Sequence, residues 1–365
     1  MLMQIDIEGY RSIKDLWLKL GRVNVLVGAN GCGKSNLYRA LWLLHAAANG
    51  EFARAVVTEG GMPSALWAGS RGKGPVRMKI AARFDDMKYQ LQVGLPVPTE
   101  TMFLLDPEIK EEHVWYNGSK SKIHLLKREG KVVHARSESG ERVTFPLTTT
   151  SAESVLSELR EPHKYPELSL LRERFRTWRF YHQFRTDVQS PIRQPQTGVR
   201  SPILRHDGSD LASALQTIRE VGDREGLQAA IDRAFPGSSV AIDNNNGMFS
   251  IGMHMPGFQR PFAAQELSDG TLQYLCLLAA LMSPRAPSLL ALNEPENSIH
   301  PDLYEALARL IADASKESQI WVTTHSRELA DYILDLTGAS PIELVKLEGA
   351  TKVVGQRLGG EEADD

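Results

Sequence analysis

Strand-like and helical patterns alternate at the start of the chain. Apolar and polar positions alternate over residues 4–13 and 16–20, which predicts two antiparallel strands. The apolar run over residues 23–27 predicts a short buried strand, and the helical spacing of apolar residues over 36–44 predicts a helix after it. This order of elements is typical of an α/β fold.

The middle of the chain has the pattern of an antiparallel sheet. Period-two alternation over residues 76–84 and 88–93 predicts a hairpin. Similar strand-like runs, separated by turn sequences at 117–118 and 139–140, follow at residues 112–116, 122–127, 131–135 and 142–146. We therefore expect an antiparallel β region, residues 76–146, inserted into the α/β frame.

The C-terminal half returns to helices and apolar strands, at residues 210–220, 223–235, 288–292 and 319–324. The length of the chain favours two lobes over one core. We expect an N-terminal lobe at residues 1–205, a C-terminal lobe at 206–358 and an acidic tail at 359–365.

Composition narrows the class of protein. The chain has 365 residues, a net charge of −3 and two cysteines, Cys32 and Cys276. Two isolated cysteines form neither a disulfide framework nor a metal motif, which fits a reducing cytoplasm. The apolar runs are shorter than the ~20 residues of a membrane helix, and the N-terminal residues lack the pattern of a signal peptide. We expect a cytoplasmic protein with no membrane partner.

One segment is locally basic. Residues 172–205 contain eight arginines and two acids. Two interpretations are open: a basic surface for the phosphates of a nucleotide or nucleic acid, or a solvated loop whose arginines pair with acids elsewhere.

The most informative motif spans residues 28–35, Gly-Ala-Asn-Gly-Cys-Gly-Lys-Ser, and fits the phosphate-loop pattern G-x-x-x-x-G-K-[ST]. Because a strand precedes it and a helix follows, the loop N–H groups and the helix N-terminus would both face phosphate. Lys34 would reach the terminal phosphates, and the Ser35 hydroxyl would join a magnesium shell. Cys32 is either a redox-sensitive thiol or a small residue that fits the loop.

Three further motifs lie beyond residue 260. Ser268 precedes a long apolar helix and Gly270 lies in its first turn, which makes either a second anion site or an ordinary capped helix. The strand at 288–292 leads into Glu294, the candidate base that orients or deprotonates an attacking water. The strand at 319–324 delivers His325 to the same sheet edge, where it would contact the γ-phosphate or that water.

In this order, the motifs resemble those of ABC-type ATPases of the structural-maintenance-of-chromosomes and RecF class. Within that class, the chain is most similar to the compact predicted ATPases without coiled coils that are often labelled AAA-family ATPases. The resemblance rests on residues 9–13, 28–36, 267–271, 293–301 and 323–326. It implies a P-loop NTPase fold of ABC-ATPase type, with ATP and Mg²⁺ as cofactors.

The resemblance also implies the role of each site residue. Arg11 would approach the nucleotide phosphates, Glu294 would be the catalytic glutamate and His325 the switch histidine. Ser268 and Gly270 would be the signature that contacts the γ-phosphate of a second subunit, so a head-to-tail homodimer with two sandwiched ATP molecules is implied. Residues 297–300 would be the D-loop, and the Walker A loop would comprise Asn30, Gly31, Cys32, Gly33, Lys34, Ser35 and Asn36.

The chain departs from the family pattern at two positions. Asn293 stands where the Walker B aspartate is expected, so an oxygen ligand for magnesium remains but its negative charge is lost. This change implies a weaker magnesium site or slow turnover. The glutamine loop is hard to place, and Gln183 is the candidate for its magnesium ligand.

The expected function is an ATP-dependent dimer clamp or switch with slow hydrolysis, in DNA repair or defence against phage, with DNA as a partner. The alternative is a regulatory ATPase that controls a separate effector protein without binding nucleic acid. A nucleotide-binding subunit of a membrane transporter is disfavoured by the Tyr10-Arg11-Ser12 segment and by the β insertion.

Overall fold

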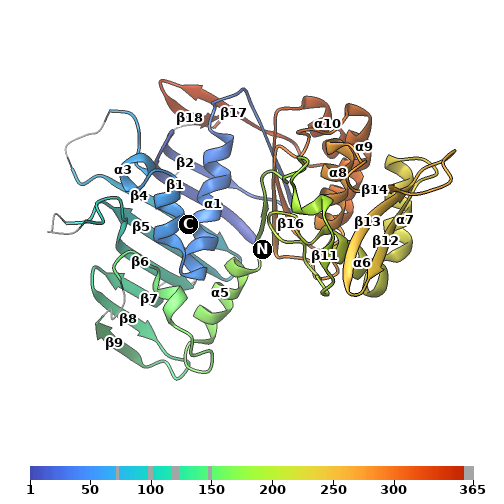
Figure 1. The fold of residues 1–365 in the computed structure, drawn as a ribbon. Coiled ribbons are helices and arrows are strands. Elements are labelled where there is room, and N and C mark those ends of the chain that lie inside the picture. The colour runs from blue at the N-terminus through green and yellow to red at the C-terminus, as the bar shows by residue number, and fades with distance from the viewer. Residues whose placement is uncertain (71–73, 98–101, 117–122, 147–149, 357–365) are drawn as a thin grey trace. The chain divides into compact units, whose positions relative to one another are not determined.

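The computed structural model describes residues 1–70, 74–97, 102–116, 123–146 and 150–356. The chain forms two compact units, whose elements are labelled in Figure 1. Unit 1 comprises residues 1–21, 28–178 and 342–365, and unit 2 comprises residues 22–27 and 179–341.

This division differs from the predicted boundary at residues 205/206. The chain passes from unit 1 to unit 2 after Trp178, and strand β3 (Val23–Val27) belongs to unit 2. The physical reason is strand pairing, because β3 and β10 (Arg179–Tyr181) lie in one parallel sheet with strands from the C-terminal half. The predicted tail at 359–365 and the predicted turn at 117–118 lie outside the described residues.

Unit 1 is built on an eight-stranded antiparallel sheet with the order β2-β1-β4-β5-β6-β7-β8-β9. The predicted β region is confirmed as antiparallel, and it extends the N-terminal hairpin because β4 pairs with β1. The strands are β1 (Leu2–Tyr10), β2 (Ile13–Lys19), β4 (Arg77–Phe84), β5 (Met87–Gly94), β6 (Glu108–Tyr116), β7 (His124–Glu129), β8 (Val132–Arg136) and β9 (Arg142–Pro146).

Helices cover this sheet. Phe175 of α5 lies edge-on to the rings of Phe84 and Tyr89 in the sheet, and His45 of α1 bonds through Nδ1 to the Phe175 carbonyl oxygen at 2.8 Å. The helices are α1 (Lys34–Asn49), α2 (Phe52–Thr58), α3 (Met62–Ala65), α4 (Val155–Glu158) and α5 (Pro166–Arg176), and a hairpin of β17 (Ile342–Leu347) and β18 (Ala350–Val353) completes the unit.

A buried ion pair joins the sheet of unit 1 to the segment before α4. Arg128 and Glu112 side chains are both 0% exposed, with Nη1 and Oε2 3.7 Å apart. Arg128 donates to the carbonyl oxygens of Ser151 and Glu153, at 3.0 and 2.7 Å, while Glu112 accepts from the Tyr89 hydroxyl at 3.0 Å. Burial raises the pKa of Tyr89, and the nearby Glu112 carboxylate adds to the rise.

Unit 2 contains the parallel strands in the order β10-β15-β16-β3, where β15 is Leu289–Asn293 and β16 is Gln319–Thr324. Every residue of β15 and β16 is buried, which explains the apolar runs Leu289–Leu292 and Ile320–Val322. Asn293 pairs with Thr323, and Thr324 pairs with Val27. The three strands therefore end at one edge of the sheet.

The other elements of unit 2 form its core and a small second sheet. Helix α8 is buried from Thr271 to Leu281, and the helices predicted at 210–220 and 223–235 are confirmed. The helices are α6 (Leu211–Val221), α7 (Arg224–Ala234), α8 (Asp269–Leu281), α9 (Tyr304–Ala314) and α10 (Arg327–Thr337), with short η1 (Pro191–Arg193) and η2 (Pro301–Leu303). The second sheet contains β11 (Gln196–Thr197), β12 (Ser239–Asn245), β13 (Met248–His254) and β14 (Phe262–Ala263).

Replacing Arg128 with alanine is expected to lower the free energy of unfolding by about 3–5 kcal/mol, because Glu112 would remain as an uncompensated buried charge. Arg142→Ala, at an exposed position of β9, is the control and should change it by less than about 0.5 kcal/mol. Urea denaturation of both variants measures the difference. Equal effects would show that the buried pair does not stabilise the fold.

Candidate functional site

The phosphate-loop motif forms a tight turn that leads into α1. Helix α1 begins at Lys34, and Gly33 before it has a φ of 112°. A Cβ on Gly33 would overlap the Thr351 side chain, and a Cβ on Gly28 would lie 2.5 Å from the Leu344 carbonyl oxygen. Glycine is therefore required at both positions.

Lys34 folds back across this loop. Its side chain donates from Nζ to the carbonyl oxygens of Gly28 and Ala29 at 2.6 and 3.3 Å, and the residue is 4% exposed. Amide groups in the first turn of a helix have no intrahelical acceptor and attract anions. A glycine-lined cradle with a buried cation fits a polyphosphate.

The remaining loop residues differ in exposure. Asn30 and Gly31 are exposed at its tip, while Ser35 lies half-buried in the first turn of α1. Cys32 is buried, and its carbonyl oxygen accepts from the Thr351 hydroxyl at 2.8 Å. This packing favours the interpretation of Cys32 as a small residue that fits the loop.

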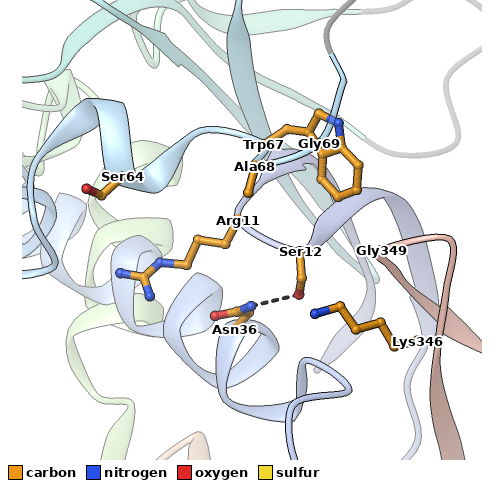
Figure 2. A pocket seen from close by; sticks show the side chains of 9 residues that line it. All are labelled: Arg11, Ser12, Asn36, Ser64, Trp67, Ala68, Gly69, Lys346 and Gly349. Carbon is orange, nitrogen blue, oxygen red and sulfur yellow. Dashed lines mark hydrogen bonds between the residues drawn. The ribbon is translucent and has the colours of Figure 1, made fainter.

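The turn between β1 and β2 is bonded to the start of α1. Asn36 Nδ2 donates to Ser12 Oγ at 2.8 Å (Figure 2). Arg11 has a φ of 49°, a left-handed conformation that is uncommon for a residue with a side chain. Its Nη2 lies 3.0 Å from Glu59 Oε2. Arg11 thus lies close to the phosphate-loop helix, and its guanidinium group forms an ion pair with Glu59.

In unit 2, an acid and a histidine meet at the ends of β15 and β16. His325 Nε2 lies 3.0 Å from Glu294 Oε1, and both side chains are partly exposed. Asn297 Nδ2 donates to Glu294 Oε2, also at 3.0 Å. Glu294 has a φ of 50°, and such strain persists only where the surroundings impose it. The structure therefore brings the two predicted catalytic residues together.

A second acid, Glu296, fixes the turn that contains His325. Its Oε1 accepts from Thr324 Oγ1 at 2.6 Å, from the His325 N–H at 2.7 Å and from the Ser326 N–H at 3.3 Å. Glu296 is 8% exposed, and its Oε2 has no hydrogen-bond partner among the described residues. Sequence reasoning missed this residue, because an acid in a polar loop after a strand gives little sign of burial.

Both the nitrogen and the oxygen of the Asn293 side-chain amide form hydrogen bonds. Its Nδ2 lies 2.7 Å from His182 Nδ1, and its Oδ1 accepts from Thr323 Oγ1 at 2.7 Å. His182 directly follows β10, the neighbour of β15, and Gln183 comes next with an exposed side chain. The sequence signal for His182 is its place directly after the short strand β10. Gln183, the predicted glutamine-loop residue, lies next to it.

The start of α8 is fixed against the loop that follows β15. Ser268 caps the helix, accepting from the Thr271 N–H at 3.1 Å. A Cβ on Gly270 would lie 2.5 Å from the Ser298 carbonyl oxygen. Arg193 donates to the Leu267 carbonyl oxygen and pairs with Asp269, both at 2.8 Å. Ser268 is thus a helix cap in this chain, and Gly270 contacts the predicted D-loop.

Several arginines of the basic segment 172–205 form ion pairs with acids. Arg174 binds Asp86 through two hydrogen bonds of 2.6 and 2.7 Å, and Arg185 pairs with Asp187 at 2.6 Å. Arg193 is held by Asp269, as described above. These contacts agree with the second interpretation of the segment, in which its arginines pair with acids.

The part of the chain that the structure describes contains neither a metal-binding cluster of the kind given next nor a membrane-spanning helix. Within it, no group of three or more His, Cys, Asp or Glu side chains could hold a metal ion. No helix in these same ranges is long and apolar enough to span a bilayer.

The phosphate loop, between a strand of a parallel sheet and a helix, defines a P-loop NTPase fold. The chain belongs to the AAA_21 family, described as "AAA domain, putative AbiEii toxin, Type IV TA system", which matches residues 23–331. The search against curated proteins returned no match.

Solved structures of SMC head domains have a similar fold. One, the "SmcHead bound to the C-winged helix domain of ScpA", is 17% identical, with 97% of each chain covered and a TM-score of 0.56. Another, the Smc head domain with an extended coiled coil bound to the C-terminal domain of ScpA from Pyrococcus furiosus, is 16% identical. It covers 97% of this chain and 95% of that chain, with a TM-score of 0.52. The predicted fold class is confirmed.

Gly270→Ala is expected to destabilise the protein by about 1–3 kcal/mol, because the added methyl group would meet the backbone at Ser298. The matched control is Gly252→Ala, where the nearest atom to a Cβ would be 3.4 Å away, an ordinary contact. Thermal unfolding of both variants tests this. If Gly270→Ala were as stable as Gly252→Ala, the start of α8 would not be fixed against the loop.

Proposed function

We propose that this protein binds ATP and hydrolyses it slowly, as an ABC-type ATPase that acts as a nucleotide-dependent dimer clamp or switch. The main supporting observation is the Glu294–His325 pair at the carboxyl edge of a parallel sheet. Strand β3 of that sheet ends at Val27, and the phosphate loop begins at the next residue. Membership of an ATPase family supports the same activity.

Each residue would contribute one part of the reaction. Lys34 and the loop N–H groups would position the phosphates and offset their charge. Glu294 Oε1 would accept a hydrogen bond or a proton from the attacking water. His325, held 3.0 Å from that oxygen, would keep the carboxylate oriented. Glu296 would act as a positioning residue, because it fixes the backbone of His325.

A phosphate-bound Mg²⁺ ion would supply charge neutralisation at the phosphoryl oxygens. The Ser35 hydroxyl, the Asn293 amide oxygen and Gln183 are the proposed protein ligands, and oxygen donors of this kind suit magnesium. Asn293 is neutral and already bonded to His182 and Thr323. This environment supports slow turnover, since no negative charge from Asn293 would help to retain the ion.

The proposed active form is a homodimer with ATP between two copies. One chain contains one phosphate loop and one signature segment, so Ser268 and Gly270 would contact the nucleotide bound to the other copy. The N-terminus of α8, where Ser268 lies, has a helix dipole that favours anions.

The biological role is a separate part of the proposal. The family description names a toxin of a type IV toxin–antitoxin system, which supports defence against phage among the expected roles. The internal pairing of Arg174, Arg185 and Arg193 reduces the charge available for DNA, which favours the alternative of a regulatory ATPase acting on an effector protein. ATP-dependent binding of duplex DNA that weakens steeply with salt would favour a DNA partner instead.

Glu294→Gln is expected to lower the ATP hydrolysis rate by about 10²–10⁴-fold, because the amide cannot accept the proton of water. ATP binding should persist, and size-exclusion chromatography with ATP and magnesium should show a trapped dimer. Glu305→Gln, on the exposed surface of α9, is the control and should behave as the wild type. A Glu294→Gln variant that stays monomeric with ATP would contradict the clamp.

Asn293→Asp is expected to raise kcat by about tenfold, equivalent to about 1.4 kcal/mol, and to lower the magnesium concentration needed for half-maximal rate. The added carboxylate would restore a negatively charged ligand for the magnesium ion. Asn244→Asp, at an exposed position of β12, is the matched control. An Asn293→Asp variant slower than the wild type would show that the amide does not limit turnover.

A further inference from the structure

A small polar cavity opens on the second sheet of unit 2, whose strands are labelled in Figure 1. Its walls come from β12, β13 and β14, from η1 and from the segment before α8, all within unit 2. The volume is about 260 Å³, which is below the ~300–1,000 Å³ of sites for drug-sized molecules. The cavity therefore suits one long side chain or a molecule of similar size.

Asp243 gives this cavity an uncompensated negative charge. Among the described residues, Asp243 and Arg193 are the ionisable ones that line it. Arg193 pairs with Asp269 at 2.8 Å and donates to the carbonyl oxygens of Ala264 and Leu267 at 2.7 and 2.8 Å. Asp243 is exposed, and its carboxylate forms no hydrogen bond or ion pair with any described residue. The cavity therefore favours a cation.

Three uncharged polar side chains face the same cavity, those of Gln194, Ser250 and Gln265. Within the described ranges, none of these side chains forms a hydrogen bond. The strand register places Ser250 directly opposite Asp243, so the hydroxyl and the carboxylate share one face of the hairpin. Ammonium and guanidinium groups have several N–H donors and no acceptor. Such a group matches a carboxylate with other oxygen acceptors around it.

An exposed aromatic ring lies next to this cavity along the chain. Phe258 is 61% exposed, and its ring packs edge-on against Phe262 with the centroids 4.8 Å apart. Phe262 directly follows Pro261, which lines the cavity. The nearby Arg260 is held by Glu266 through two hydrogen bonds of 2.7 Å. Aromatic rings of this kind are typical contacts at protein interfaces, whereas a small amine in the cavity would have no need of one.

We propose that this face of unit 2 binds an extended segment of a partner polypeptide. An arginine or lysine side chain of the partner enters the cavity and pairs with Asp243, and an adjoining apolar residue packs against Phe258. Arg193 bonds both the cavity wall at Ala264 and Asp269 in the first turn of α8, so the bound segment contacts the part of the chain that leads into α8. This binding needs no ATP and goes beyond the proposed function.

Two pools of five-residue synthetic peptides test this on the immobilised full chain without ATP. One pool has arginine at the central position and the other has citrulline, a neutral analogue, while the flanking positions vary among phenylalanine, leucine, alanine and glycine. The wild type should retain the arginine pool about fivefold better, the upper end for exposed ion pairs. Asp243→Asn should remove this preference. Asp331→Asn, at an exposed position of α10, is the matched control and should keep it.

Phe258→Ala supplies a second readout that does not involve charge. It should lower the retention of both pools by about fivefold or more and leave the ratio of arginine to citrulline peptides unchanged. Val188→Ala, at another exposed apolar residue of unit 2, is the control and should behave as the wild type.

Three results would overturn the proposal. The wild type could retain the two pools equally, Asp243→Asn could keep the preference for arginine, or Phe258→Ala could bind both pools as the wild type does. In the third case, displacement of the arginine pool by the free amine agmatine would identify a small amine as the ligand instead of a polypeptide.

Discussion

The parallel pairing of β3, β16 and β15 is the constraint on which the candidate site depends. The register aligns Val27 with Thr324 and Thr323 with Asn293, so three strands from distant parts of the sequence end at one edge. The residues that follow them are Gly28, His325 and Glu294. A register shift of one residue would turn alternate side chains to the opposite face, and the acid and histidine would no longer meet.

Hydrogen bonds hold two candidate site residues in backbone conformations that residues with side chains rarely adopt. Glu294 adopts a positive φ, and its N–H is bonded to the Thr323 carbonyl oxygen at 2.7 Å. Arg11 also has a positive φ, and its N–H is bonded to the Ala65 carbonyl oxygen at 2.9 Å. Each strained conformation costs on the order of 1–3 kcal/mol. Glycine would be less strained at both positions.

The sequence was most informative where a local pattern determines the structure. The strand Val23–Val27, the glycine loop after it and the apolar strands around Glu294 and His325 could be predicted because each depends on short-range periodicity and turn chemistry. The unit boundary could not, since the pairing of β10 with β15 joins residues more than a hundred positions apart. Glu296 and His182 were missed for a related reason: the burial of Glu296 and the bond between His182 and Asn293 exist only after distant strands pair. The β17–β18 hairpin was not predicted, because its strands are too short for a recognisable alternation of apolar and polar residues.

The contact between Gly270 and the Ser298 carbonyl oxygen has a mechanical consequence. The start of α8 lies so close to the loop that contains Asn297 that a methyl group would not fit between them. Asn297 in turn donates a hydrogen bond to Glu294. The two segments are therefore in direct contact. In the proposed dimer, the start of α8 would contact the nucleotide bound to the partner. The loop that contains Asn297 would lie beside the chain's own nucleotide. A displacement of either segment would then pass through this contact to the other. The two ATP sites would be coupled in this way.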